Sequence, residues 1–210
     1  NTNLPIVAGN VSFYNQSGDN AIPSSPMIGC FGKNIDVNKS IQNSFQSEGS
    51  VVFLLGGSNF SMGGSVVADL LAIDNNDVHR FSNKQFSMLL NSLIGLESRE
   101  LILSSRVVTR GGLAVSLCKM SFQNNIGTNV HLAKEKFSEK LLNENLSILL
   151  EVHDADARNV EKILEKKDIP FDIIGSTCIE KTITINDKIS LSINETKNIW
   201  EHSLREKLLS

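Results

Sequence analysis

The chain has 210 residues, which is enough for one full domain or for one domain with part of another. Hydrophobic residues make up 40% of it and charged residues 20%, a composition that supports a core and excludes a disordered tail. A net charge of −3 with dispersed Lys and Arg excludes a strong general attraction to nucleic acid or anionic membrane.

Short apolar runs between turn residues predict strands, and apolar residues spaced three or four apart predict helices. In chain order we expect strands at Met27–Lys33 and Ser50–Leu55, helices at Ser65–Ala72 and Asn83–Leu96, a strand at Glu100–Ser105, a helix at Gly112–Met120 and a buried strand at Leu146–Val152. After these come a helix at Asp156–Lys166, strands at Phe171–Ile174, Ile179–Ile185 and Ile189–Ile193, and a last helix over Glu195–Leu209 capped by Asn194. Asn186 and Asp187 are typical of a hairpin turn between the last two strands. Strands and helices mix without strict alternation, so we expect an α+β fold with a mixed sheet packed with helices.

Cysteine and histidine give no sign of a metal site or a nucleophile. The three cysteines lie far apart without a Cys-x-x-Cys pair, and the four histidines lack metal-ligand spacing. The His153–Asp156 stretch is better explained by an aspartate that caps the following helix. The chain carries no secretory signal, and runs such as Val51–Leu55 are too short to cross a bilayer, so we expect a cytoplasmic protein without membrane or nucleic-acid partners.

Glycine-rich loops and one polar N-terminal segment are the candidate ligand sites. Gly56–Gly64 and Gly111–Gly112 match neither phosphate-binding glycine motif and fit flexible turns into helices or ligand loops. The segment Gly9–Asn15 gathers amides, a hydroxyl and a phenol behind the strand-like Pro5–Ala8. Its oxygens could ligate Mg²⁺ or hold a phosphate, and an ordinary polar turn explains it equally well.

Two segments carry a resemblance to a known family. Pro5–Asn15 reads Pro-Ile-Val-Ala-Gly-Asn-Val-Ser-Phe-Tyr-Asn, and Ala21–Gly29 reads Ala-Ile-Pro-Ser-Ser-Pro-Met-Ile-Gly. Together they resemble the small type of phosphoribosylformylglycinamidine synthase subunit II, with Ala8, Gln16 and Ser25 replacing the family's usual Ser, Glu and Thr. Later matches follow in the same order along nearly the whole chain, but those motifs are shared across the wider aminoimidazole ribonucleotide synthetase superfamily.

The resemblance implies an ATP-dependent ligase of purine biosynthesis. Such an enzyme converts formylglycinamide ribonucleotide into its amidine with ammonia from glutamine, and works with a glutaminase subunit and a small bridging subunit. Because Asn1–Asn3 is followed at once by the apolar run Pro5–Gly9 with no initiator Met before it, we expect a C-terminal part of the synthase, inactive without the N-terminal half. Residues 1–20 would end a nucleotide-binding-type domain, and residues 21–210 would form the C-terminal domain of the superfamily.

The resemblance also implies roles for three residues. Gly9 would lie against ATP, Asn10 would ligate Mg²⁺, and Ser12 would contact the ribonucleotide substrate. Their chemistry suits these roles, because glycine lets a nucleotide approach the backbone and amide or hydroxyl oxygens suit a hard cation or a hydrogen bond. None is an acid, base or nucleophile; the family's catalytic His belongs to the N-terminal half, so we expect no catalytic residue here.

One loop departs from the family pattern. Where relatives write Ser-Ala-His-Asp-x-Ser-Asp-Gly-Gly, this chain has Arg106, Val107 and Arg110 in place of the His and the two Asp residues. A metal site built on those carboxylates is therefore lost, and we expect the loop to be structural or at most to bind an anion.

Two other interpretations remain open. The chain could be a non-catalytic domain that completes an interface for the N-terminal half, which predicts no nucleotide contact at Gly9–Ser12. It could also belong to another superfamily member, such as aminoimidazole ribonucleotide synthetase, a selenophosphate enzyme or a hydrogenase-maturation enzyme, although these carry a different pattern at Asn10–Asn15.

Overall fold

The structure is a computed structural model, and it describes residues 5–10, 15–22, 25, 27–56, 61–73 and 82–209. The chain divides into two compact units, Asn1–Ser40 and Ile41–Ser210. The expected boundary between residues 20 and 21 stays a prediction.

The first unit contains little regular structure. Strands β1 (Gln16–Ser17) and β2 (Asn20–Ala21) form a small antiparallel hairpin, and a 3₁₀ turn covers Val37–Lys39. The strand expected at Met27–Lys33 is wrong: these residues belong to no strand or helix, and Met27 is 97% exposed. An apolar run becomes a strand only where a neighbouring strand pairs with its backbone, and the described part of this unit offers that run no such partner.

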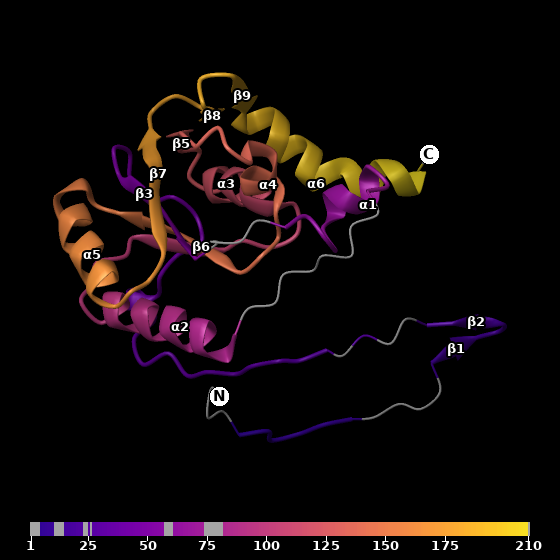
Figure 1. The fold of residues 1–210 in the computed structure, drawn as a ribbon. Helices are drawn as coiled ribbons and strands as arrows, with labels where there is room; N and C mark the ends of the chain where they lie inside the picture. The colour runs from indigo at the N-terminus through magenta and orange to yellow at the C-terminus, as the bar shows by residue number, and fades with distance from the viewer. Residues whose placement is uncertain are drawn as a thin grey trace. The chain divides into compact units, whose positions relative to one another are not determined.

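The second unit is built on a seven-stranded mixed sheet (Figure 1). Its strands are β3 (Val51–Gly56), β4 (Ser104–Val107), β5 (Gly127–Val130), β6 (Ser147–Val152), β7 (Phe171–Cys178), β8 (Thr182–Ile185) and β9 (Ile189–Ser192). They lie in the order β4-β6-β3-β7-β5-β8-β9, and neighbours are antiparallel except for the parallel pair β5 and β8.

Helices cover both faces of this sheet. They are α1 (Val66–Leu70), α2 (Asn83–Glu97), α3 (Gly112–Phe122), α4 (Phe137–Leu142), α5 (Asp154–Lys166) and α6 (Ile193–Leu209). Figure 1 shows α3, α4 and α6 on one side of the strands and α2 and α5 on the other. The α+β fold with a mixed sheet is therefore confirmed. Within the described ranges, no helix is both long and apolar enough to span a membrane.

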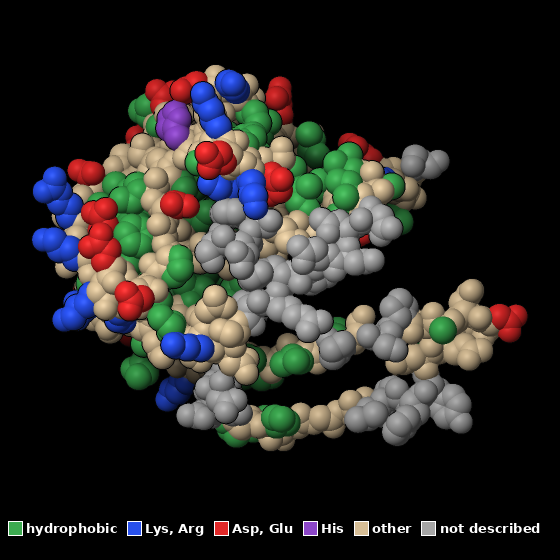
Figure 2. All heavy atoms as spheres, in the orientation of Figure 1, with side chains coloured by type: hydrophobic (Ala, Val, Ile, Leu, Met, Phe, Trp, Pro, Cys, Tyr) green, Lys and Arg blue, Asp and Glu red, His purple; other side chains and the backbone are tan. Residues whose placement is uncertain are grey.

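Two hydrophobic cores follow from the alternation of side chains along the central strand. Val52 and Leu54 of β3 point into the core shared with α3, while Phe53 and Leu55 point into the core shared with α2 and α5. This alternation is what a strand with both faces covered requires. On the face shown in Figure 2, side chains of both charge signs are interspersed, in keeping with the small net charge.

Several elements begin elsewhere than the sequence predicts. Strand β4 starts at Ser104, because Glu100 has a φ of 57° and forms a turn where a strand was expected. Helix α6 starts at Ile193, so Asn194 lies inside the helix, and the hydroxyl of Ser192 accepts the N–H of Glu195 at 3.4 Å instead.

The start of α5 also differs from the expectation. His153 occupies the cap position without a side-chain hydrogen bond, whereas Asp154 and Asp156 lie in the first turn. There they stabilise the helix through its dipole and do not cap it. The Asn186–Asp187 hairpin turn is confirmed, with φ values of 51° and 55°.

A buried carboxylate fixes the loop that leads into β3. Glu151 of β6 has no exposed surface and accepts the N–H of Gln46 at 2.8 Å, the N–H of Ser47 at 2.9 Å and the hydroxyl of Ser104 at 2.6 Å. Hydrogen bonds to a carboxylate are among the stronger ones, so the loop is held firmly against β4 and β6.

Candidate functional site

The predicted ligand segment lies in the first unit. Gly9 and Asn10 are exposed and belong to no helix or strand, and a side chain placed at Gly9 would meet nothing within 4 Å. Its backbone is therefore open to the approach of another molecule. Ser12 lies outside the described residues. The roles expected for these three residues stay predictions.

The two glycines at the start of α3 have a structural reason to be glycine: Gly111 is its N-cap and Gly112 its first residue. Gly111 and Gly112 have φ values of 87° and 70°, which side chains rarely adopt. A Cβ at Gly112 would lie 2.6 Å from the carbonyl carbon of Leu142, and one at Gly111 would lie 2.4 Å from a methyl group of Val115. The turn and the close approach of α3 to the end of α4 therefore both require glycine.

A carboxylate that sequence reasoning missed joins this turn to the first helix. One oxygen of Glu144 accepts the N–H of Gly111 at 2.8 Å and the N–H of Val66 at 3.0 Å. The hydroxyl of Ser65 caps the same helix by accepting the N–H of Ala68 at 3.2 Å. Glu144 thus connects the turn at Gly111 with the start of α1, two segments that are far apart in the sequence. No sequence pattern identifies this role.

The two arginines of the altered loop have different surroundings. Arg106 extends from β4 and donates from Nε to the carbonyl of Asn43 at 3.1 Å, and burial lowers the pKa of its guanidinium. Arg110 is exposed. Only Arg106 therefore lies in an enclosed setting.

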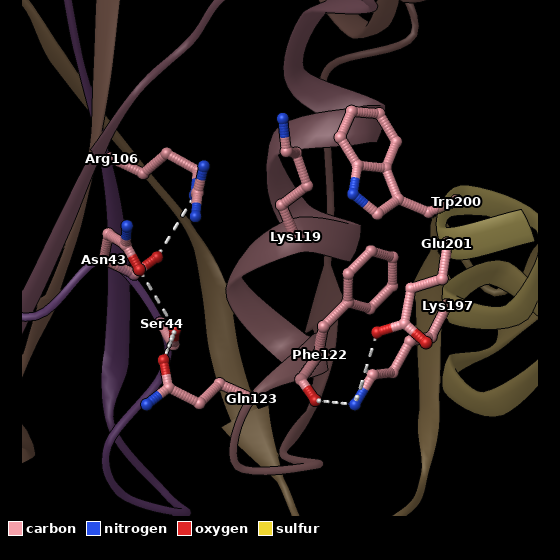
Figure 3. A pocket seen from close by; sticks show the side chains of 9 residues that line it. All are labelled: Asn43, Ser44, Arg106, Lys119, Phe122, Gln123, Lys197, Trp200 and Glu201. Atoms are coloured by element: carbon pink, nitrogen blue, oxygen red, sulfur yellow. Dashed lines mark hydrogen bonds and ion pairs between the residues drawn. The ribbon is translucent and has the colours of Figure 1, made fainter. Parts of the chain in front are cut away.

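Arg106 borders a hollow between β4, α3 and α6, which we call the basic hollow (Figure 3). It has a volume of about 290 Å³ and is lined by Asn43, Ser44, Arg106, Lys119, Phe122, Gln123, Lys197, Trp200 and Glu201. The ammonium of Lys119 lies 4.0 Å from the centre of the Trp200 ring. Burial first, and the charge of Arg106 second, lower the pKa of Lys119.

Sequence reasoning did not find the basic hollow. Trp200 lies in a stretch for which the sequence predicted only a last helix, and Lys119 lies within α3 without any motif. Arg106, Lys119 and Trp200 lie on three different elements, β4, α3 and α6. Only the fold brings their side chains together, so no sequence pattern could have indicated the hollow. Among the described residues, no group of three His, Cys, Asp or Glu side chains is placed to hold a metal ion.

Comparison with known proteins identifies the family of this fold. The model of the AIR synthase related protein C-terminal domain matches residues 47–188. The chain belongs to this family. It is also 32% identical over 210 residues to the phosphoribosylformylglycinamidine synthase subunit PurL of Picrophilus torridus, covering 98% of this chain and 27% of that protein. The PurL of Thermus thermophilus is 29% identical, with 98% of this chain and 29% of that protein covered.

Solved structures agree on the fold. Phosphoribosylformylglycinamidine synthase II of Thermotoga maritima matches with a TM-score of 0.63 at 14% identity, over 75% of this chain and 27% of that one. A structure of the T. maritima PurL complexed with FGAR matches with a TM-score of 0.62 at 14% identity, over 76% of this chain and 29% of that one. The resemblance to synthase subunit II found in the sequence is confirmed, and the chain spans only 27–29% of the length of these relatives.

Proposed function

We propose that the chain is the C-terminal part of an ATP-dependent ligase that converts formylglycinamide ribonucleotide into formylglycinamidine ribonucleotide. The observation that carries this proposal is the similarity to PurL over 98% of the chain, which extends beyond residues 47–188 into the N-terminal segment. The T. maritima PurL structures complexed with ATP and with FGAR share its fold, with TM-scores of 0.59 and 0.62.

In this proposal the first unit supplies binding groups and no acid, base or nucleophile. ATP would supply the phosphoryl group that activates the formamide oxygen before ammonia displaces it. The backbone at Gly9 is open enough to lie against the nucleotide, and the exposed amide of Asn10 suits Mg²⁺ as an oxygen ligand. Ser12 would contact the ribonucleotide.

The partners belong to the same proposal. Ammonia would come from a glutaminase subunit joined through a small bridging subunit, and the catalytic His would come from the N-terminal half of the synthase. A cytoplasmic location goes with this role in purine biosynthesis.

The test is ADP release by the full-length synthase in the presence of formylglycinamide ribonucleotide and ammonia. Asn10→Ala should raise the Mg²⁺ and ATP concentrations needed for half-maximal rate, and Ser12→Ala should mainly raise the KM for the ribonucleotide. Loss of one neutral hydrogen bond costs about 0.5–1.5 kcal/mol, so the Ser12 effect should be roughly 2- to 13-fold. Asn20→Ala, the same change in the exposed strand β2, is the matched control.

Two results would contradict the proposal. The 210-residue chain alone should give background ADP release, and turnover by it would show that the N-terminal half is not needed. A full-length protein that releases no ADP in response to the ribonucleotide would remove the assigned reaction.

A non-catalytic interface domain is the second candidate. The described part of α6 exposes Ile199, Trp200 and Leu204 to 64%, 53% and 70%, an apolar surface typical of a contact with other protein. If Asn10→Ala and Ser12→Ala behave like Asn20→Ala in the full-length enzyme, this candidate replaces the first.

A further inference from the structure

The basic hollow is rich in hydrogen-bond donors. Arg106 lines the hollow and uses only its Nε in the hydrogen bonds of the described residues, so the N–H groups of both Nη atoms are available to a ligand. The side-chain amides of Asn43 and Gln123 contribute further N–H groups, while their oxygens accept from the Ser44 hydroxyl at 3.3 Å and 2.9 Å. The lining is therefore suited to a ligand made of acceptors.

Its two central cations are not neutralised by protein. Within the described ranges, no carboxylate forms an ion pair with Arg106 or Lys119. Among the described lining residues, Glu201 is the only carboxylate, and it lies 4.0 Å from the ammonium of Lys197. Lys197 in turn donates to the carbonyl of Phe122 near the end of α3, at 3.4 Å. Lys197 and Glu201 are thus engaged with each other and with the helix end, where a cation is favoured.

Arg106 and Lys119 repel each other across the hollow. Figure 3 shows the guanidinium extending from β4 toward α3 and the ammonium rising beside the Trp200 ring. The charge of Arg106 contributes to the lowered pKa of Lys119, which means that the two groups sense each other. An anion between them would replace this repulsion by two attractions in a partly enclosed setting.

We propose that the basic hollow binds a phosphate monoester. The phosphate would lie between Arg106 and Lys119, because a guanidinium grips a phosphate with two parallel N–H groups and an ammonium adds a point charge. The organic part of the ester would lie against Trp200 and Phe122. The volume of about 290 Å³ is roughly ten times the ~30 Å³ of a water molecule in the liquid, which is room for a phosphate with a small organic group.

The site is held in shape before any ligand binds. The loop that carries Asn43 and Ser44 is fixed from behind by the buried carboxylate of Glu151, through the N–H groups of Gln46 and Ser47. A preformed set of donors loses less conformational freedom on binding than a set on mobile side chains. This inference is independent of the proposed ligase, since it uses none of Gly9, Asn10 or Ser12.

The chain carries its own reporter for the test. Trp200 is the only tryptophan of the 210 residues and lines the basic hollow, so its fluorescence responds to binding there. The purified 210-residue chain is titrated with ribose 5-phosphate, inorganic phosphate and ribose at constant ionic strength. We expect saturable quenching or enhancement with ribose 5-phosphate, weaker binding of inorganic phosphate and none of ribose.

Variants locate the site. Arg106→Gln and Lys119→Gln should each raise the Kd for ribose 5-phosphate at least tenfold, and Arg106→Lys should lie between wild type and Arg106→Gln. Lys162→Gln, which removes an exposed cation from α5 on the other side of the sheet, is the matched control and should leave the Kd unchanged. A thermal melt of each variant separates lost binding from lost folding.

The outcomes decide between the parts of the proposal. Equal affinity for inorganic phosphate and ribose 5-phosphate, with the same loss in both variants, supports the anion site and overturns its assignment to an ester. If folded Arg106→Gln and Lys119→Gln proteins bind ribose 5-phosphate as tightly as wild type, the proposal is wrong.

Discussion

At the scale of single residues, Gly112 at the start of α3 and Gly49 separate two reasons for a glycine, which are its backbone conformation and the lack of space for a side chain. Gly112 and Gly49 have similar φ values of 70° and 75°, but a Cβ at Gly112 would meet the backbone of Leu142 whereas one at Gly49 would meet open space. Gly49→Ala should therefore cost only the left-handed backbone term of about 1–2 kcal/mol. Gly112→Ala adds a backbone clash and should cost about 2–5 kcal/mol in total, measured by urea unfolding. If both variants lower the free energy of unfolding equally, α3 can move away from the backbone of Leu142 without loss of stability.

The thiol of Cys118 makes stability depend on pH. Burial raises the pKa of Cys118 from 9.0 to about 11, so at pH 8 the thiol is protonated in both the folded and the unfolded chain. Between pH 9 and 11 the unfolded chain loses the proton first, and the free energy of unfolding therefore falls as pH rises. The stability difference between wild type and Cys118→Ala should narrow by roughly 1 kcal/mol from pH 8 to pH 10. Cys30→Ala, which removes an exposed thiol, is the control variant. If the difference in unfolding free energy between wild type and Cys118→Ala stays constant from pH 8 to pH 10, the thiol of Cys118 is not buried.

Single residues are also where sequence reasoning reaches its limit at the candidate sites. The Gly111–Gly112 turn was expected because glycine restricts the backbone in a way that the sequence itself displays. Glu144 and Lys119 were not expected, because their roles depend on groups that folding brings from other elements, such as the N–H of Val66 and the ring of Trp200. The partner of a single charged residue cannot be predicted from that residue or its neighbours in the sequence.

At the scale of elements, α6 divides into a buried start and an exposed remainder. Ile193 is 1% exposed in the core beside α3, whereas Ile199 in the same helix is 64% exposed. Ile193→Ala should therefore lower the free energy of unfolding by about 2–5 kcal/mol, because it leaves a cavity. Ile199→Ala should change it by no more than about 0.5 kcal/mol, since Ala loses no buried contact there. Circular dichroism during urea unfolding measures both, and a large cost at Ile199 would place that face in a buried contact.

Helices and strands were predicted correctly where the pattern of apolar residues in the sequence matches the pattern of buried residues in the fold. Leu146–Val152 was expected as a buried strand, and every residue of β6 is buried between the two helical layers. The short helix α4 and the polar strand β5 were missed. The residues of β5 read Gly-Thr-Asn-Val and become a strand because β7 and β8 pair with their backbone. Pairing partners of that kind lie far away in the sequence, so no local pattern announces them.

At the scale of the whole molecule, the core belongs to the second unit. Every buried hydrophobic residue that the structure describes lies at Phe45 or later, and the family model matches residues 47–188. In the first unit, Ile6, Met27 and Phe31 are 94%, 97% and 97% exposed. The mixed sheet and its two helical layers are therefore formed by residues 41–210, and the free energy of folding comes from apolar surface buried there.

Removal of residues 1–40 should therefore leave the second unit folded. A chain of residues 41–210 keeps both cores, the buried Glu151 and every residue that lines the basic hollow. We expect one cooperative thermal transition with a midpoint within about 2 °C of the longer chain, because the deletion takes away no described buried side chain. Brief trypsin treatment of the longer chain should cut first at the exposed Lys33 and Lys39 and leave a resistant product close to this length. A midpoint lower by more than about 5 °C for the shorter chain would mean that the first unit contributes to the folded state of the second.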